Sequence, residues 1–488
     1  MLFNSVTYIA IFLPIVCILY WQMRGKGKLW LLLSASIIFY GFWRIEFVPL
    51  MLGSAIMDYY LALAIDKRED PVKRKRLLWI SVAVNLGILG FFKYFNFFAS
   101  SVFSVADLMG LKASFTTVNI ILPLGISFYI FQTLSYTIDV YRRDIPPERS
   151  LLRYMTFVTF YPHLVAGPIM RPDILIPQLK DPAPFLSSNV RKGIERILIG
   201  LCLKVLLADS IGFFVDESFA QDIAHLSAFD AWTMSFLFGF QIYFDFAGYS
   251  SIAIGSAMIM SIYVPENFNF PYLATSPREF WKRWHISLST WIRDYLYLPM
   301  LGTKRSAGHG AWDTLTEKAE TVTEAKRTRA LFLTWAIMGL WHGANWTFVL
   351  WGIYHAAMIF LQRLLSPLVR LPANVFGWAV SVAITLPLMM AAWIPFRAHS
   401  LHDAFRLWAK MIDPRAYHGF SLPPNNYFLA AAVLIGMFIA WALREKLAPR
   451  MNPNGPVFLA LKTVFLFAVF SLVFINLEAK AQFIYFQF

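Results

Sequence analysis

The chain has 488 residues, of which 58% are hydrophobic and only 15% are charged, whereas a soluble protein carries about 25% charged residues. The mean hydropathy of +0.55 and the aromatic content of 17% exclude a disordered chain, a fibrous repeat and an ordinary cytosolic enzyme. The formal net charge is +14, but the basic residues cluster in short loops between apolar runs. This pattern is typical of cytoplasmic loops in a multi-pass membrane protein and argues against nucleic-acid binding.

Apolar runs of roughly the length that a spanning helix needs, about 20 residues, recur along the whole chain. They predict an all-α, polytopic membrane fold with about 11–13 helical spans, some of them re-entrant or broken. We expect a bend at Pro123 and Gly125, a re-entrant segment over 151–168, and a break around 339–345 in the long run 330–361. In chain order, the runs are 2–21, 29–43, 47–65, 77–97, 119–141, 151–168, 197–207, 232–246, 250–264, 330–361, 376–396, 427–443 and 457–475.

Basic loops predict how these spans are oriented. Lys and Arg cluster at 24–28, 67–76, 142–143 and 444–450, and cytoplasmic loops carry such an excess. The N-terminus and the tail after residue 475 are then expected outside. The mixed-charge stretch 304–329 is also basic and is expected in the cytoplasm. We see no linker rich in Pro or Gly, so residues 1–488 are predicted to form a single membrane domain.

The stretch 278–297 breaks the apolar pattern and reads REFWKRWHISLSTWIRDYLY. As a helix, it would place His285, Ser289 and Arg293 on one face, because they are four residues apart. A lipid-facing helix could not carry this many charges. The stretch is therefore expected either at the membrane interface or facing a cavity lined by protein.

A second polar interruption lies at 338–346, which reads MGLWHGANW. Gly339 and Gly343 form a pair of small residues that lets another helix approach closely. His342 lies between glycines in an apolar stretch. It is either a hydrogen-bonded packing residue or a functional one, and its spacing does not distinguish the two.

These two motifs in combination, WHISLSTWIRDYLY (284–297) and GLWHGANW (339–346), resemble the membrane-bound O-acyltransferase (MBOAT) family. The resemblance is closer to its bacterial alginate O-acetyltransferase-like branch. LPLGISFYIFQ (122–132), PHLVAGPI (162–169) and YFDFAGYS (243–250) resemble the same branch. The resemblance implies a catalytic core over about 77–361 around a central tunnel. C-terminal spans over 376–475 and an aromatic tail at 476–488 follow it.

The resemblance also implies roles for the two histidines. His342 matches the catalytic histidine of the family, and His285 matches a second active-site position that is Asn in many eukaryotic members. An imidazole can take the proton of a hydroxyl that attacks a thioester. We therefore expect His342 to act as general base and His285 to orient the acceptor or stabilise the oxyanion. The sequence has no His-Glu-x-x-His or His-x-x-Glu-His pattern, so neither a catalytic metal nor a tightly bound cofactor is expected.

Five further polar residues are weaker candidates for donor or substrate binding. Asp245, in the apolar YFDF run, is expected to face a cavity or to pair with a base. Arg283, Arg293 and Asp294 are expected either to bind donor phosphates or to pair with one another. Ser289 belongs to this group by its place on the expected polar face.

Three other residues complete the candidates. Asn345 and Tyr249 are expected to line the tunnel as hydrogen-bonding groups. Tyr485 lies in the tail sequence FIYFQF (483–488), which is either an interfacial aromatic anchor or an acyl relay. The relay is implied by resemblance to the C-terminal motif of bacterial acyl-export systems.

The sequence thus predicts a multi-pass O-acetyltransferase of the bacterial inner membrane. It would pass acetyl from a cytoplasmic donor, acetyl-CoA by resemblance, across the membrane to an exported polysaccharide such as alginate or cellulose. The resemblance implies an extracytoplasmic acetyltransferase partner and polysaccharide export machinery, and membrane lipids are expected around the chain. Two alternatives stay open: a transporter or polysaccharide channel without catalysis, or a peptidoglycan or lipid O-acyltransferase of the same fold.

Overall fold

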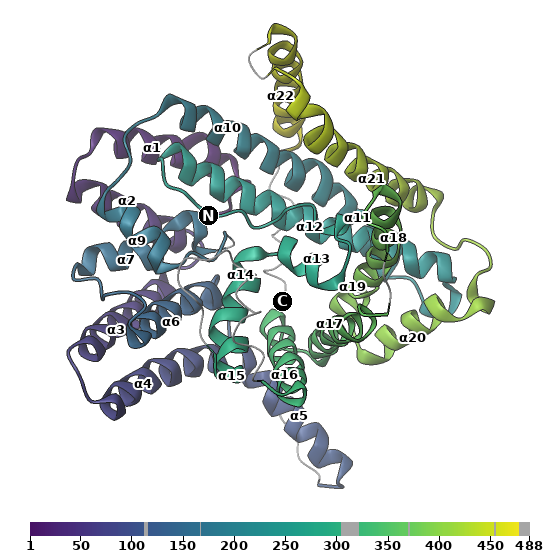
Figure 1. Ribbon diagram of the computed structural model, residues 1–488, viewed down its shortest axis with the longest axis horizontal. Helices are drawn as coiled ribbons and strands as arrows, with labels where there is room; N and C mark the ends of the chain where they lie inside the picture. The colour runs from purple at the N-terminus through teal and green to yellow at the C-terminus, as the bar shows by residue number, and fades with distance from the viewer. Residues whose placement is uncertain (112–115, 166, 304–321, 369–370, 453–454, 478–488) are drawn as a thin grey trace. The chain divides into compact units, whose positions relative to one another are not determined.

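The protein is helical throughout the residues that its computed structural model describes, which are 1–111, 116–165, 167–303, 322–368, 371–452 and 455–477 (Figure 1). No β-strand occurs in these ranges, so the all-α prediction is confirmed. The chain divides into two compact units. Unit 1 consists of residues 1–194 and 253–265, and unit 2 of residues 195–252 and 266–488. The single membrane domain stays a prediction.

Unit 1 is built from helices, and the first element in the chain is a short π-helix, η1. Two capped starts illustrate why they form. The Asp70 carboxylate accepts the Val72 N–H at 2.8 Å before α4, and the Ser150 hydroxyl accepts the Arg153 N–H at 3.3 Å before α7, so each satisfies a donor at a helix start. The elements are η1 (Thr7–Phe12), α1 (Leu13–Gln22), α2 (Lys26–Gly41), η2 (Ile45–Phe47), α3 (Val48–Asp66), α4 (Pro71–Leu89), η3 (Gly90–Tyr94), α5 (Phe95–Leu108), α6 (Ile126–Arg142), α7 (Leu151–Thr159), α8 (Tyr161–Leu164) and α9 (Pro172–Lys180).

A buried carboxylate links two of these helices. Asp58 on α3 is fully buried. Its two oxygens accept hydrogen bonds from the Ser81 hydroxyl at 2.5 Å and from the Asn85 amide at 2.7 Å, both on α4. A buried polar group without such donors would cost free energy. The α3–α4 pair is therefore fixed in register by polar contacts as well as by apolar packing.

Unit 2 holds the rest of the chain, and its boundary with unit 1 falls within α10 and α12. In Figure 1, α16 and α17 run side by side as an antiparallel pair, which fits the extensive contact between them. The elements are α10 (Ser187–Leu201), η4 (Cys202–Ala208), α11 (Asp209–Phe219), η5 (Ile223–His225), α12 (Ala228–Ile259), η6 (Pro271–Leu273), α13 (Pro277–Arg283), α14 (Ile286–Ile292), η7 (Arg293–Tyr297), α15 (Leu298–Leu301), α16 (Glu324–His342), α17 (Trp346–Leu365), α18 (Val375–Ala391), α19 (Trp393–Arg397), α20 (Leu401–Ile412), η10 (Pro414–Ala416), α21 (Pro424–Ala442), η11 (Leu443–Leu447), η12 (Ala448–Arg450) and α22 (Pro456–Asn476).

Two glycines set the closest crossing in the core of unit 2. A Cβ atom on Gly200 of α10 would lie 2.7 Å from the Gly248 carbonyl oxygen of α12. A Cβ on Gly248 would lie 2.8 Å from the Gly200 carbonyl oxygen. Only residues without a side chain allow two backbones to approach this closely. The crossing brings Lys204, in the π-helical segment η4, against α12.

Within the described residues, eight helices are long and apolar enough to span a membrane. The chain is therefore a multi-pass membrane protein. The spans are Ile45–Asp66, Pro71–Leu108, Ser187–Phe219, Ala228–Ile259, Trp346–Leu365, Val375–Arg397, Pro424–Leu447 and Phe458–Asn476, with a shorter apolar helix at Thr7–Gln22.

The difference from the expected dozen spans has physical reasons. The predicted runs 232–246 and 250–264 lie largely in one continuous helix, α12, because Gly248 fits a helix crossing instead of breaking the helix. The predicted runs 29–43, 119–141 and 151–168 contain helices of only 16, 17 and 9 residues. Gly125, the site of an expected bend within a helix, is instead the residue that precedes α6. There the backbone is left-handed, with φ of +67°, and an added Cβ would lie 2.5 Å from the Leu164 carbonyl oxygen.

Candidate active site

The stretch 278–297 is not a single helix, so this part of the prediction is wrong. Helix α13 ends at Arg283, Trp284 is extended, and His285 is left-handed, with φ of +41°, before α14 begins at Ile286. A contact with another segment of the chain explains the break. The Ile286 N–H donates to the Asn267 carbonyl oxygen at 3.0 Å instead of to a carbonyl oxygen of the preceding helical turn. Ser289 and Arg293 keep their four-residue spacing, but His285 lies outside that helical face.

His285 is fully buried, and its hydrogen bonds define its tautomer. Its Nδ1 lies 3.1 Å from the Asn267 Oδ1, which also accepts the Ser287 backbone N–H at 3.2 Å. A backbone N–H can only donate, so this Asn267 atom is the oxygen and His285 Nδ1 carries the hydrogen. The Nε2 lone pair has no hydrogen-bond partner within the described residues. Burial lowers the pKa of His285 to about 3, which keeps the ring neutral at physiological pH.

His342 is the last residue of α16. Its side chain is 4% exposed, whereas His285 is 0% exposed. Gly343 is extended after it, and the Asn345 side chain then accepts the Thr347 N–H at 3.0 Å to start α17. The predicted break around 339–345 is thus confirmed. Asn345 is exposed and acts as this helix cap.

Aromatic rings bring the two histidines into one cluster. The His342 ring centroid lies 4.8 Å from that of Trp341 and 4.8 Å from that of Trp351. The His285 ring lies 6.5 Å from the same Trp341 ring. Another buried histidine, His355 of α17, packs 4.7 Å from Trp351. His285 and His342 therefore meet around Trp341, although they are 57 residues apart in the sequence.

Close packing of α16 on α17 fixes the position of His342. A Cβ on Gly339 would lie 2.2 Å from the Phe348 carbonyl oxygen, and one on Gly352 would lie 2.1 Å from the Trp335 carbonyl oxygen. The expected close approach at Gly339 is confirmed, but its partner glycine is Gly352. Gly343 lies beyond the helix, where a Cβ would meet the Phe348 ring.

A cavity of about 370 Å³, here called the arginine cavity, opens between α13–α15 and the α16–α17 pair. Its apolar wall includes Trp281, Trp335 and Met338, and Met338 lies one helical turn before His342. Neither His285 nor His342 lines it. The lining residues are Arg278, Trp281, Ser289, Ile292, Arg293, Tyr297, Leu301, Arg327, Leu331, Thr334, Trp335, Met338, Ile359, Gln362, Arg363 and Ser366.

The arginines of this cavity are held by defined partners. Arg293 pairs with Asp294 at 2.6 Å, and Arg363 pairs with Glu324 at 2.9 Å. Of the predicted binding residues, Ser289 and Arg293 line the cavity. Arg283 does not line it, because its guanidinium pairs with Glu279 at 2.6 Å. Asp294 does not line the cavity but forms an ion pair with Arg293. Pairing within this group is one of the two predicted alternatives, the other being phosphate binding.

Comparison with known proteins connects this geometry to a family. The model of the membrane-bound O-acyltransferase (MBOAT) family matches residues 47–316. A probable alginate O-acetylase AlgI of Pseudomonas putida is 35% identical, with all of both chains covered. The chain belongs to the membrane-bound O-acyltransferase family. A peptidoglycan O-acetyltransferase of Helicobacter pylori is 34% identical, over 84% of this chain and 80% of its own. A teichoic acid D-alanyltransferase of Bacillus subtilis is 28% identical, over 58% of this chain and 71% of its own.

This MBOAT protein is therefore an O-acyltransferase, and its motif 243–250 has a structural place. Asp245 lies 2.6 Å from the Lys204 Nζ, which also lies 2.7 Å from Asp209. The expectation that Asp245 pairs with a base is confirmed. Tyr249 is buried, and Lys204 lies 5.8 Å from its ring centroid. Tyr485 falls outside the described residues.

Several residues of the site escaped the sequence interpretation. The sequence could have identified Lys204 as a partner for a carboxylate. It is the only charged residue of the run 197–207, and an intramembrane charge needs a counter-charge. Asn267 had none, because nothing in its neighbourhood connects it to His285. Arg327 lies in α16 and Arg363 in α17, and only the packing of these two helices brings the arginines into one cavity. No group of three potential metal-ligating side chains occurs among the residues described, and the absence of a metal stays a prediction.

Proposed function

We propose that this O-acyltransferase takes acetyl from a cytoplasmic thioester donor, acetyl-CoA, and passes it across the bacterial inner membrane for O-acetylation of an exported polysaccharide such as alginate. The relative that matches over its full length is named a probable alginate O-acetylase, which supports acetyl as the group and alginate as the polymer. The observation that carries the proposal is the arginine cavity beside the buried histidine cluster.

The arginine cavity suits a donor that carries phosphates. Arg278, Arg293, Arg327 and Arg363 line it, and guanidinium groups bind phosphate through paired N–H donors. The tryptophan and methionine side chains of the same wall would contact the apolar part of the donor. Leu301 and Arg327 line the cavity and flank the 304–321 stretch, which the sequence places in the cytoplasm. These observations support donor entry from that side.

His342 would act as general base on the acceptor hydroxyl. Its imidazole takes the hydroxyl proton while the oxygen attacks the thioester carbonyl carbon. As the C–S bond breaks, the imidazolium returns the proton to the leaving thiolate, so the histidine ends the cycle neutral. A positioned base of this kind contributes about 10²–10⁴-fold to the rate. His342 lies at the end of α16 with 4% of its surface exposed and both ring nitrogens buried, so the substrates would have to reach a buried imidazole.

His285 would orient the acceptor. Its neutral ring, with hydrogen on Nδ1, presents the Nε2 lone pair and can accept a hydrogen bond from a hydroxyl. The alternative role, stabilising the oxyanion, requires a donor at Nε2, which this tautomer lacks. We therefore propose that the His285–Asn267 pair holds the acceptor hydroxyl toward His342. A protein partner outside the membrane and a relay through Tyr485 stay predictions.

The test compares two histidines that pack on the same tryptophan. Purified His342→Gln in detergent is expected to lose acetyl transfer from radiolabelled acetyl-CoA by at least about 100-fold, because glutamine cannot accept and return the proton. His355→Gln is the matched control, since His355 also contacts Trp351. It is expected to keep most of the activity. Equal losses in both variants, or normal transfer by His342→Gln, would contradict the proposal.

A further inference from the structure

A second cavity, of about 490 Å³, is lined by residues of unit 1 and shares no lining residue with the arginine cavity; it is here called the basic surface cavity. It opens where the apolar helix Thr7–Gln22 ends and α2 begins. Helix α2 packs on α7, and α7 packs on α9, so three helices frame it. The lining residues are Trp21, Met23, Arg24, Gly25, Lys26, Lys28, Leu29, Arg153, Leu179, Lys180, Pro182, Ala183, Pro184 and Phe185.

All the charged residues that line this cavity are positively charged. Five of its lining residues are basic and none is acidic. Arg24, Lys26, Lys28 and Lys180 have no carboxylate partner within the described residues. Instead, the Lys28 ammonium lies 4.3 Å from the Tyr20 ring centroid and 4.6 Å from that of Trp21. Aromatic faces hold this cation without neutralising it, so the cavity keeps its net positive charge.

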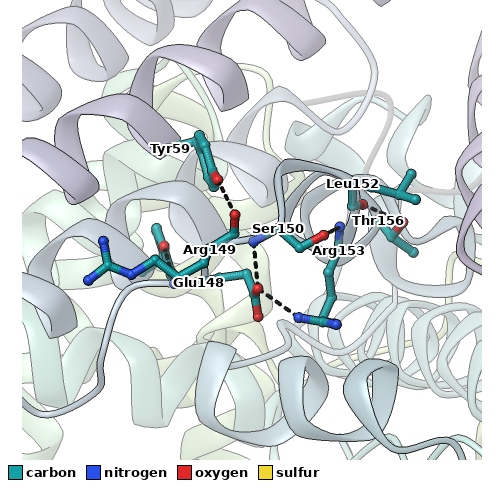
Figure 2. Close-up of polar contacts among 8 residues, drawn as sticks. Tyr59, Glu148, Arg149, Ser150, Leu152, Arg153 and Thr156 are labelled. Atoms are coloured by element: carbon teal, nitrogen blue, oxygen red, sulfur yellow. Dashed lines mark hydrogen bonds and ion pairs between the residues drawn. The ribbon is translucent and has the colours of Figure 1, made fainter. Parts of the chain in front are cut away.

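Arg153 is the one cation of the cavity that carries its own counter-charge. Figure 2 shows its guanidinium directed at the Glu148 carboxylate, at 2.7 Å, and its backbone N–H bonded to Ser150. The same Glu148 oxygen accepts the Ser150 N–H at 2.7 Å. This network anchors the wall of the cavity. The four other basic side chains can therefore bind an anionic ligand.

The surroundings of the cavity favour an amphipathic ligand over a soluble one. Ile11, Ile15 and Ile18 each leave more than half of their side-chain surface exposed, and their spacing places them on one helical face that leads toward Trp21. Trp21 and Phe185 pack edge to face at 5.1 Å beside the basic residues. Aromatic rings of this kind lie at the level of lipid headgroups.

We propose that the basic surface cavity binds the phosphodiester headgroup of an anionic membrane lipid, whose acyl chains lie along the exposed isoleucine face of η1 and α1. Clusters of basic residues beside membrane-associated helices on the cytoplasmic side bind anionic headgroups, and the basic loop 24–28 is predicted to be cytoplasmic. The phosphate is recognised by the lysines, and the chains by the apolar face. A free phosphate shares only the first of these two contacts.

The experiment measures lipid binding to the full-length protein by native mass spectrometry, with phosphatidylglycerol and phosphatidylcholine as probes. The triple variant Lys26→Gln, Lys28→Gln, Lys180→Gln is expected to weaken phosphatidylglycerol binding by more than about tenfold. The matched control is Lys67→Gln, Lys75→Gln, Arg76→Gln, which removes three exposed positive charges from another predicted cytoplasmic loop. It is expected to stay within about twofold of the parent.

Three outcomes would overturn the proposal. Equal losses in the two triple variants would mean that only overall charge matters. Equal binding of phosphatidylcholine and phosphatidylglycerol would exclude recognition of an anionic headgroup and leave an acidic protein partner as the alternative. Displacement of the lipid by inorganic phosphate at equal concentration would show that the acyl chains contribute nothing and that the site takes free phosphate.

Discussion

The arginine cavity and the basic surface cavity differ in how their charges are held. In the arginine cavity, Arg293 and Arg363 are paired with Asp294 and Glu324, and the wall is formed by tightly packed helices. In the basic surface cavity, the lysines lack carboxylate partners within the described residues, and they lie at the start of α2 and at the end of α9. Fixed guanidinium groups suit a ligand that must be oriented for a reaction. Ammonium groups without carboxylate partners suit a ligand that needs only to be retained.

The glycines of the two regions show the same contrast. At the arginine cavity, the backbones at Gly339 and Gly352 leave no room for a side chain. At the basic surface cavity, Gly25 is needed only for its left-handed backbone, with φ of +52°, and no other atom lies within 4 Å of an added Cβ. Packing therefore requires glycine at the first cavity, whereas local backbone conformation requires it at Gly25 in the second.

The largest effect is expected when the wall of the arginine cavity is forced apart. Gly339→Val places a branched side chain against the Phe348 carbonyl oxygen and should cost about 3 kcal/mol or more. We expect a lowered Tm and loss of the monodisperse peak in size-exclusion chromatography. Gly436→Val on α21 is the control, because nothing lies within 4 Å of its Cβ. A Gly339→Val protein as stable as this control would contradict the close helix contact.

A pair of reciprocal substitutions sharpens the comparison of the charges. Arg293→Lys keeps the charge but removes the paired N–H donors, and it is expected to raise the KM for the acetyl donor about tenfold. Lys28→Arg in the basic surface cavity is expected to leave lipid binding within about twofold, since a diffuse attraction needs only the charge. Steady-state kinetics and native mass spectrometry measure the two effects. Equal tolerance at both positions would remove the distinction.

The smallest effect concerns pH. Burial lowers the pKa of His285 to about 3 from an ordinary value near 6.5, so the unfolded state binds more protons than the folded state between these values. Stability is then complete above about pH 6.5 and falls as the pH is lowered toward 3, by at most about 1.4 kcal/mol per pH unit. His285→Gln should flatten this decline in Tm between pH 7 and 5. An unchanged slope would mean that His285 is protonated in the folded state.

The sequence predicted the family, the break after His342 and the need of Asp245 for a basic partner. The expected role of His342 came from the family resemblance, the break from its neighbouring glycines, and the partner of Asp245 from the cost of a carboxylate in an apolar run. A charged residue in an apolar run can be recognised in the sequence, because it requires a compensating contact. The compensating residue on the other side, Lys204, could have been found by the same reasoning.

The failures arise where tertiary contacts override local pattern. Helical periodicity across 278–297 gave no warning that His285 adopts a left-handed backbone, since residues other than glycine rarely do so. The break depends on hydrogen bonds that the oxygens of Asn267 accept, and Asn267 lies in a separate loop. The arginine cavity likewise depends on α16 and α17 folding back on each other, and no spacing rule links Arg278 to Arg327.

The ion cluster around Lys204 has a consequence for how the chain enters the membrane. The helical segment that carries Lys204 is completed before α12 is synthesised, so Asp245 cannot yet offset the ammonium charge. Asp209, five residues further along the same segment and 2.7 Å from the Lys204 Nζ in the folded protein, travels with it through the translocation machinery. The segment thus carries its own counter-ion during biogenesis, and Asp245 joins it only when the two helices meet at Gly200 and Gly248.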